Sequence, residues 1–353
     1  MIKVLIVDDS SFMRKALAQI MALEQSMEVI GTAVDGQEAI QKVSQLHPDV
    51  VLLDIEMPVM DGLTALVHIM TENPTPILML SALNKRDTTI AIKSLQYGAV
   101  DFIAKPSGVI SYDIDKLGKE IIAKVKAVAS VNVHRMRLPM PVEHYQPQKS
   151  GLATRKEIVV IGASTGGPSA VAQVLSSLPS DISTAIIVVQ HMSSEFIPSF
   201  VDRLKWCCPL TVSVAKRGET IESGRVLIAP GSYHTMIMAN GIGNKIRLSR
   251  KISTQDIYPS IDYAMESAAQ AYGEGTLGVL LTGLGSDGAR GLKAIKEAGG
   301  STIAEDESTC VVFGMPKAAI EMGCVDEIVP LPQIARAVLR MIMNRKGRAK
   351  KNA

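Results

Sequence analysis

The first third of the chain alternates short apolar runs with longer stretches in which apolar residues recur every three or four positions. The apolar runs predict strands at residues 3–7, 28–33, 49–53, 76–80 and 99–103. The periodic stretches predict helices at residues 12–23, 37–46, 63–70, 88–95 and 117–128. Strands that alternate with amphipathic helices are typical of a parallel sheet covered by helices, so we expect an α/β domain here.

The pattern breaks down at about residues 129–156 and then begins again. This stretch contains Pro139, Pro141 and Pro147, which are unfavourable inside a helix. Beyond it, a second parallel sheet is predicted by apolar runs at residues 158–161, 185–189, 226–229, 277–281 and 302–304. We therefore expect two doubly wound parallel-sheet domains at residues 1–125 and 157–345, an interdomain linker at residues 126–156 and a basic tail at residues 346–353.

The composition argues against several classes of protein. A formal net charge of +2, with acidic and basic residues interspersed, does not favour nucleic-acid binding. The four cysteines lack the spacing of a metal site. Acidic residues follow the first apolar run at once, and no apolar stretch is long enough to span a membrane. We expect a cytoplasmic protein that does not insert into membranes.

Acidic residues follow two of the expected strands of the first domain. Asp8 and Asp9 come after the first strand and Asp54 after the third, while Ser81 and Lys105 follow the fourth and fifth. Because the carboxyl ends of parallel strands meet at one edge of a sheet, we expect these side chains to converge. Three carboxylates repel one another unless a hard divalent cation such as Mg²⁺ lies between them. One of them could then accept a phosphoryl group; the alternative is a set of ordinary helix N-caps.

Short motifs in this domain match a known family, and they occupy residues 7–10, 53–58, 61–62, 81–82 and 105–106. With them, residues 1–125 resemble the response-regulator receiver domain, which has a flavodoxin-like fold. The resemblance implies that Asp54 is phosphorylated by a chemotaxis histidine kinase and that Lys105 pairs with the phosphoryl oxygens. Ser81 would be the switching hydroxyl and Phe102 the aromatic switch. The implied Mg²⁺ ligands are Asp8, Asp9, Asp54 and the backbone carbonyl of Glu56.

A serine between glycines follows the first expected strand of the second domain. This is Ser164, within residues 162–167, at a strand-to-helix turn that would display a nucleophile. His191 and Asp287 each follow a later apolar run. Histidine can take the serine proton near neutral pH, and a carboxylate fixes the imidazole tautomer. The three residues form a candidate hydrolytic triad, with His234 as a second possible base.

The segment around the aspartate permits another interpretation. Residues 283–288 form a literal GxGxxG between an expected strand and an expected helix, and Glu305 lies near the acidic position of a dinucleotide-binding turn. However, Asp287 would place a carboxylate beside the two phosphates, which is unfavourable without a cation. We therefore prefer the hydrolytic interpretation and keep dinucleotide binding as an alternative.

Longer motifs in the second domain lie at residues 162–168, 190–192, 228–231, 281–288 and 310–316. With them, residues 156–343 resemble the Rossmann-like catalytic domain of the chemotaxis protein-glutamate methylesterases. The resemblance implies that the domain demethylates glutamyl methyl esters on methyl-accepting chemoreceptors, releasing methanol, and that it deamidates receptor glutamines. It also implies that the triad given above is catalytic and that the esterase site holds no cofactor. Leu284 stands where the family often has methionine, and Tyr258 where it often has a basic residue. The alternative is a phosphorylation-dependent protein-binding module with an idle triad.

Overall fold

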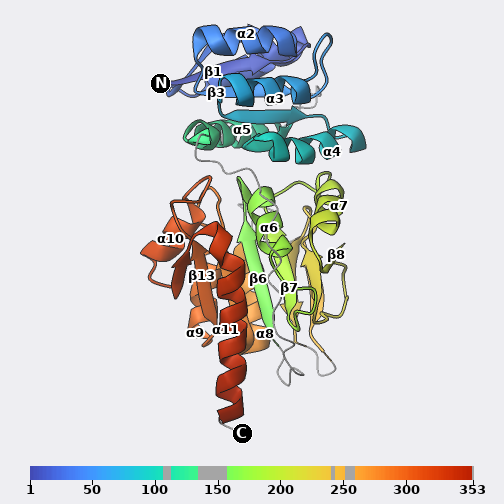
Figure 1. The fold of residues 1–353 in the computed structure, drawn as a ribbon, viewed down its shortest axis with the longest axis vertical. Helices are drawn as coiled ribbons and strands as arrows, with labels where there is room; N and C mark the ends of the chain where they lie inside the picture. The colour runs from blue at the N-terminus through green and yellow to red at the C-terminus, as the bar shows by residue number, and fades with distance from the viewer. Residues whose placement is uncertain (106–112, 134–156, 240–242, 251–258, 352–353) are drawn as a thin grey trace. The chain divides into compact units, whose positions relative to one another are not determined.

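The computed structural model describes residues 1–105, 113–133, 157–239, 243–250 and 259–351. The chain divides into two compact units, Met1–Met140 and Pro141–Ala353, each built around its own sheet (Figure 1). Within the described ranges, no helix is long and apolar enough to cross a membrane.

The first unit is a five-stranded parallel sheet in the order β2-β1-β3-β4-β5, which is the flavodoxin-like order. Its strands are β1 (Ile2–Val7), β2 (Met27–Ala33), β3 (Val50–Asp54), β4 (Ile77–Ser81) and β5 (Asp101–Ala104). Its helices are α1 (Ser11–Ala22), α2 (Gly36–Leu46), α3 (Gly62–Glu72), α4 (Lys85–Ser94) and α5 (Asp113–Ala129), with a short 3₁₀ turn at Leu95–Tyr97. Strands β3 and β4 are buried throughout because helices cover both faces of the sheet.

Polar residues fix where these helices begin. Each of α1 to α4 follows a side chain that accepts a hydrogen bond from a backbone N–H of the first turn, and these side chains belong to Ser10, Asp35, Asp61 and Asn84. Such caps satisfy amides that have no partner inside the helix. The acids that cap α2 and α3, Asp35 and Asp61, are therefore different from the acids at the strand ends. The N-cap alternative does not account for Asp8, Asp9 and Asp54.

The second unit is a seven-stranded parallel sheet in the order β14-β13-β12-β6-β7-β9-β8, with a separate antiparallel hairpin of β10 and β11. Its strands are β6 (Ile158–Ala163), β7 (Ala185–Gln190), β8 (Thr211–Val214), β9 (Arg225–Ile228), β10 (His234–Met238), β11 (Lys245–Ser249), β12 (Thr276–Leu280), β13 (Ser301–Glu305) and β14 (Glu327–Val329). Its helices are α6 (Gly167–Ser176), α7 (Ile197–Cys207), α8 (Ile261–Tyr272), α9 (Ala289–Glu297), α10 (Met315–Glu321) and α11 (Leu331–Lys351), with a 3₁₀ turn at Gly273–Gly275.

The chain changes direction across this sheet at β6. From β6 it proceeds to β7 on one side, and it later returns to place β12 on the other side. Helices α6 and α11 contact each other on one face of the sheet, and α8 and α9 contact each other on the opposite face (Figure 1). Ligands of doubly wound sheets bind at the carboxyl ends of the strands beside such a reversal. The fold thus directs attention to the segments that follow β6, β7 and β12.

The predicted architecture of two doubly wound parallel-sheet domains is confirmed. The ends of α5, at Asp113 and Ala129, lie beyond those of the helix predicted at residues 117–128. The hairpin of β10 and β11 and the edge strands β8 and β14 were not predicted.

Candidate functional site

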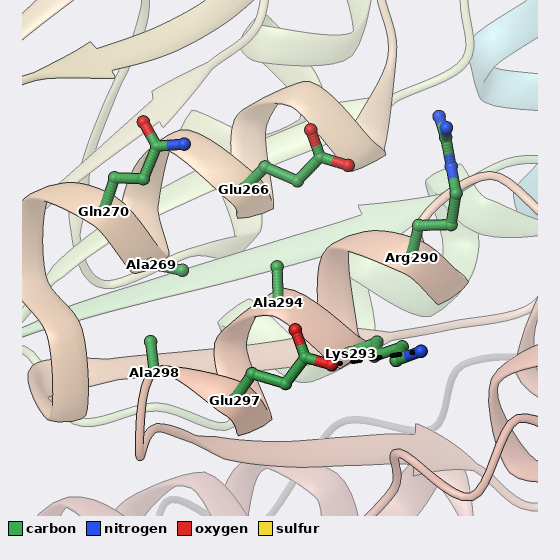
Figure 2. Close-up of a pocket in the computed structure, with 8 residues that line it drawn as sticks. All are labelled: Glu266, Ala269, Gln270, Arg290, Lys293, Ala294, Glu297 and Ala298. Carbon is green, nitrogen blue, oxygen red and sulfur yellow. Dashed lines mark ion pairs between the residues drawn. The ribbon is translucent and has the colours of Figure 1, made fainter.

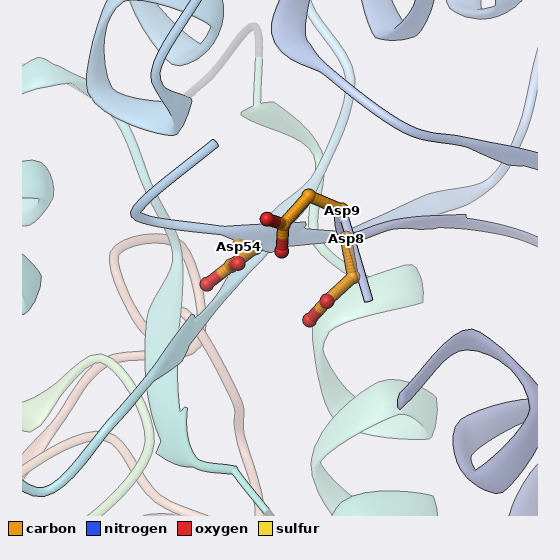
Figure 3. A group of neighbouring side chains, drawn as sticks. All are labelled: Asp8, Asp9 and Asp54. Carbon is orange, nitrogen blue, oxygen red and sulfur yellow. The ribbon is translucent and has the colours of Figure 1, made fainter. Parts of the chain in front are cut away.

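The acidic residues of the first unit gather at the carboxyl edge of its sheet. Asp8 and Asp9 directly follow β1, and Asp54 is the last residue of β3. One carboxylate oxygen of each lies within 4.8 Å of the others. Figure 3 shows the three side chains as neighbours. Asp8 and Asp54 are buried, whereas Asp9 is exposed. The structure therefore brings together the three carboxylates that the sequence placed on separate strands.

The charge balance of this cluster suits a divalent cation. Lys105 Nζ lies 2.9 Å from Asp8 Oδ2 and 2.7 Å from Asp54 Oδ2. Burial raises the pKa of Asp54 to about 6, although the hydrogen bond from Lys105 acts in the opposite direction. One lysine does not balance three carboxylates, and carboxylate oxygens are the ligands that Mg²⁺ prefers. The residues present thus fit the expected metal.

The remaining candidates of the first unit lie around this edge. Ser81 ends β4, is fully buried, and donates a hydrogen bond from its hydroxyl to the carbonyl of Ala82 at 2.9 Å. The Phe102 side chain is buried in β5. The Glu56 carboxylate is exposed and pairs with Arg86 at 2.8 Å. This ion pair engages the side chain of Glu56 and not the backbone carbonyl that we expect to bind the metal.

Gly62 controls the position of the Asp54 backbone, because a Cβ added at Gly62 would lie 1.8 Å from the carbonyl oxygen of Asp54. We expect Gly62→Ala to displace this backbone, lower stability by about 2 kcal/mol and slow phosphorylation roughly tenfold. Gly118→Ala is the matched control, since its Cβ would make an ordinary 3.7 Å contact with Ile20. Denaturant unfolding and the rate of phosphoryl incorporation check both variants; an unchanged rate in Gly62→Ala would contradict the prediction.

The triad candidates of the second unit lie at the ends of three adjacent strands. Ser164 follows β6, His191 follows β7, and Asp287 lies in the segment between β12 and α9. His191 Nε2 is 2.7 Å from Asp287 Oδ2. Ser164 and His191 are only half-buried, so a reacting group can approach them from solvent. The structure therefore joins the expected base to the expected acid.

The carboxylate of Asp287 is held by the beginning of α8. It accepts hydrogen bonds from the backbone amides of Ile261 at 2.7 Å and Asp262 at 3.0 Å, and from the Ser260 hydroxyl at 3.1 Å. Burial alone would raise the pKa of Asp287, but the hydrogen bond from His191 and these amides hold it below its ordinary value. The acid is thus kept ionised and oriented towards the imidazole.

Ser164 is presented by a tight turn. Its carbonyl accepts a 2.8 Å hydrogen bond from the Gly167 amide, and Gly166 between them has a positive φ of 76°. Gly167 begins α6, so the serine stands in the turn that leads into this helix. In the part of the chain that the structure describes, the Ser164 hydroxyl makes no hydrogen bond. Its contact with His191 is expected to form when a substrate binds.

The structure decides between alternatives that the sequence left open for His191 and for residues 283–288. His234, the second possible base, is buried and accepts the Ser260 amide through Nδ1 at 3.2 Å, so the histidine that bonds the acid is His191. The dinucleotide interpretation is contradicted, because Asp262 Oδ1 accepts the amides of Gly288 and Gly291 at 2.8 Å each. A carboxylate already occupies the start of α9, where the pyrophosphate would bind.

Sequence reasoning missed several residues that support the site. Ser260 and Asp262 were not singled out, although Ser-x-Asp before a periodic apolar stretch is a helix-start signal that could have found them. Gln190 Nε2 donates a 2.8 Å hydrogen bond to the Ser164 carbonyl, and Thr282 O accepts the Ser164 amide at 3.0 Å. No sequence pattern marks these last two contacts, since they depend on the order of the strands.

A groove of about 480 Å³ lies between α8 and α9 (Figure 2). Small residues, among them Ala269 and Ala294, form part of its lining, together with charged side chains such as Glu266 and Lys293. The triad candidates are not among its lining residues. The groove is therefore separate from the candidate active site.

Comparison with known proteins gives a family match for each of the two units. Residues 4–111 match the response regulator receiver domain, and residues 159–338 match the CheB methylesterase model. A protein-glutamate methylesterase/protein-glutamine glutaminase of Pyrococcus abyssi is 44% identical over 97% of this chain and 94% of its own length. The chain belongs to the CheB methylesterase family. A relative of the same name from Geobacillus kaustophilus is also 44% identical, over 97% of this chain and 99% of its own.

This chain is also similar to the crystal structure of the Thermotoga maritima CheB methylesterase catalytic domain. The TM-score is 0.52 and the identity 39%, over 53% of this chain and 99% of that one. The predicted membership of the CheB methylesterase family is thus confirmed. Of the two departures from the family pattern, Leu284 is 41% exposed beside the turn that leads to Asp287. Tyr258 lies outside the described residues.

Proposed function

We propose that this CheB methylesterase family member hydrolyses glutamyl methyl esters on chemoreceptors, releasing methanol, and deamidates receptor glutamines, under the control of phosphorylation at Asp54. The observation that carries the proposal is the 2.7 Å hydrogen bond between His191 and Asp287, at the strand ends next to Ser164. A serine, a histidine and an anchored carboxylate on adjacent strands suit acyl transfer.

The reaction begins when Ser164 Oγ attacks the ester carbonyl carbon. Because Nε2 of His191 is bonded to Asp287, the serine proton passes to the other ring nitrogen, Nδ1. Backbone amides of the turn that directly follows Ser164, between β6 and α6, would donate to the oxyanion. His191 then returns the proton to methanol as the C–O bond of the ester breaks, and a water molecule deprotonated by His191 hydrolyses the acyl-enzyme. With a glutamine substrate the same steps release ammonia.

Asp54 is the proposed phosphoryl acceptor, and Mg²⁺ is the proposed metal, held by Asp8, Asp9, Asp54 and the backbone carbonyl of Glu56. A bound Mg²⁺ supplies positive charge that offsets the phosphoryl oxygens and the carboxylates. Lys105, which now pairs with Asp8 and Asp54, would pair with the phosphoryl group. The Ser81 hydroxyl would rotate from the Ala82 carbonyl towards the phosphoryl group, and Phe102 would repack in response.

The proposed partners are methyl-accepting chemoreceptors as substrates and a chemotaxis histidine kinase as phosphodonor. We expect the enzyme to act in the cytoplasm, without nucleic acid and without entering the membrane. The methylesterase site requires no cofactor in the proposed mechanism.

Methanol release from methylated chemoreceptor membranes tests this function. The full chain should release methanol, and a small phosphodonor together with Mg²⁺ should increase the rate, whereas either alone should not. Binding to the receptors without methanol release under any condition would instead favour the phosphorylation-dependent binding module with an idle triad.

A further inference from the structure

Glu305 is a buried ionisable residue that the proposed mechanism does not use. It is the last residue of β13, and its side chain has no exposed surface. Its two oxygens are engaged by different segments: Oε2 accepts the Thr282 amide at 2.8 Å, and Oε1 accepts the Thr309 hydroxyl at 3.1 Å. A carboxylate is costly to bury, so its presence here calls for a specific role.

On the first side, Glu305 holds a residue that supports the nucleophile. The Thr282 carbonyl accepts the Ser164 amide at 3.0 Å, and the Thr282 hydroxyl donates to the Thr165 carbonyl at 3.0 Å. The next residue, Gly283, is packed so closely that an added Cβ would lie 2.7 Å from Ser164 Cβ. Two hydrogen bonds in series thus connect Glu305 to the backbone of Ser164.

On the second side, Glu305 holds the segment that covers the serine turn. The Thr309 hydroxyl also accepts the Leu331 amide at 2.9 Å, which fixes its position. Two residues later, Val311 packs against the turn, since a Cβ added at Gly166 would lie 2.5 Å from Val311 Cβ. Glu305 therefore reaches the nucleophile turn from both directions.

We propose that Glu305 is a positioning residue of the active site, whose carboxylate fixes the Thr282 peptide and Thr309 and thereby the place of Ser164. Glu305 touches no substrate and acts through these two threonines. The inference rests on the proposed assignment of Ser164 as nucleophile. It gives a role to the acid that the sequence had placed near the acidic position of a dinucleotide-binding turn.

The ionisation of Glu305 should be visible in the stability of the protein. Burial raises its pKa to about 7, while the hydrogen bonds from Thr282 and Thr309 act in the opposite direction. The ionisable groups that face it are Cys310 and Asp306. An acid with a raised pKa stabilises the fold below its ordinary pKa of 4.5, and this contribution is lost as the pH rises to about 7. Wild-type Tm should fall over this range relative to Glu305→Gln; parallel curves would contradict the titration.

Three variants test the positioning role by steady-state methanol release. Glu305→Met removes the acceptor at similar volume and should lower kcat by roughly 10- to 100-fold with KM nearly unchanged. Glu305→Gln keeps an acceptor for the Thr282 amide and should restore kcat to within about threefold. Thr302→Val is the matched control, since Thr302 lies buried at the opposite end of β13, where its hydroxyl donates to Cys324 O. It should lower Tm without changing kcat.

The amide proton of Ser164 gives a second measurement, which needs only the isosteric variant. In wild type, the amide NMR shifts of Thr282 and Ser164 should change with pH at the same midpoint, that of Glu305. Glu305→Gln should abolish this change. If the Ser164 amide shift lacks this pH-dependent change, or if Glu305→Met keeps the wild-type kcat, the proposal is overturned. Ser164→Ala in the same assay separates the two claims. If it retains turnover, the nucleophile assignment fails; if it is inactive while Glu305→Met is fully active, only the positioning role fails.

Discussion

Replacing Ser164 by alanine should lower kcat for methanol release by roughly 10⁴-fold or more. The substitution removes the oxygen that attacks the ester, while the hydrogen bond between His191 and Asp287 and the turn at Gly166 stay in place. The loss should therefore appear in kcat, with little change in receptor binding or Tm. Single-turnover release from methylated receptor membranes measures it directly.

The control for this variant is Ser169→Ala, since Ser169 is a half-buried serine in the first turn of α6, five residues after Ser164. It should retain wild-type turnover. If both variants hydrolyse the ester equally well, Ser164 is not the nucleophile, and the mechanism given above is wrong.

Replacing Asp54 by asparagine should abolish phosphoryl incorporation and with it the activation by a phosphodonor. The amide offers no carboxylate oxygen to accept the phosphoryl group, and it also removes one of the three acids of the metal cluster. Basal methanol release should persist, because the triad lies on the other unit of the chain. Incorporation of labelled phosphate and the ratio of activated to basal release measure the two effects.

Asp61→Asn provides the comparison for Asp54→Asn. Asp61 is an exposed carboxylate that caps α3 by accepting the Thr64 amide at 2.7 Å, a contact that asparagine can also make. This variant should be phosphorylated and activated normally. Continued phosphorylation of Asp54→Asn at the wild-type rate would show that another residue is the acceptor.

The sequence predicted those features that depend on local pattern. Buried strands such as β3 and β6 are continuous apolar runs, and the candidate residues stand directly after them, so their convergence followed from parallel order. The edge strand β8 has an exposed first residue, Thr211, and β10 and β11 form a small sheet apart from the main one, so their patterns are weak. The contacts of Glu305 and Asp262 join residues more than twenty positions apart, and no local pattern specifies them.

The contacts of Asp287 with the start of α8 restrict the motion of this side chain more than that of His191. Two backbone amides and a hydroxyl hold this carboxylate independently of the histidine. The imidazole of His191, by contrast, is bonded to Asp287 through Nε2. In the proposed reaction it exchanges a proton first with the serine and then with the leaving group or water. We therefore expect Asp287 to keep its place during the proposed reaction, and the rotation that moves the proton to occur in the imidazole ring of His191.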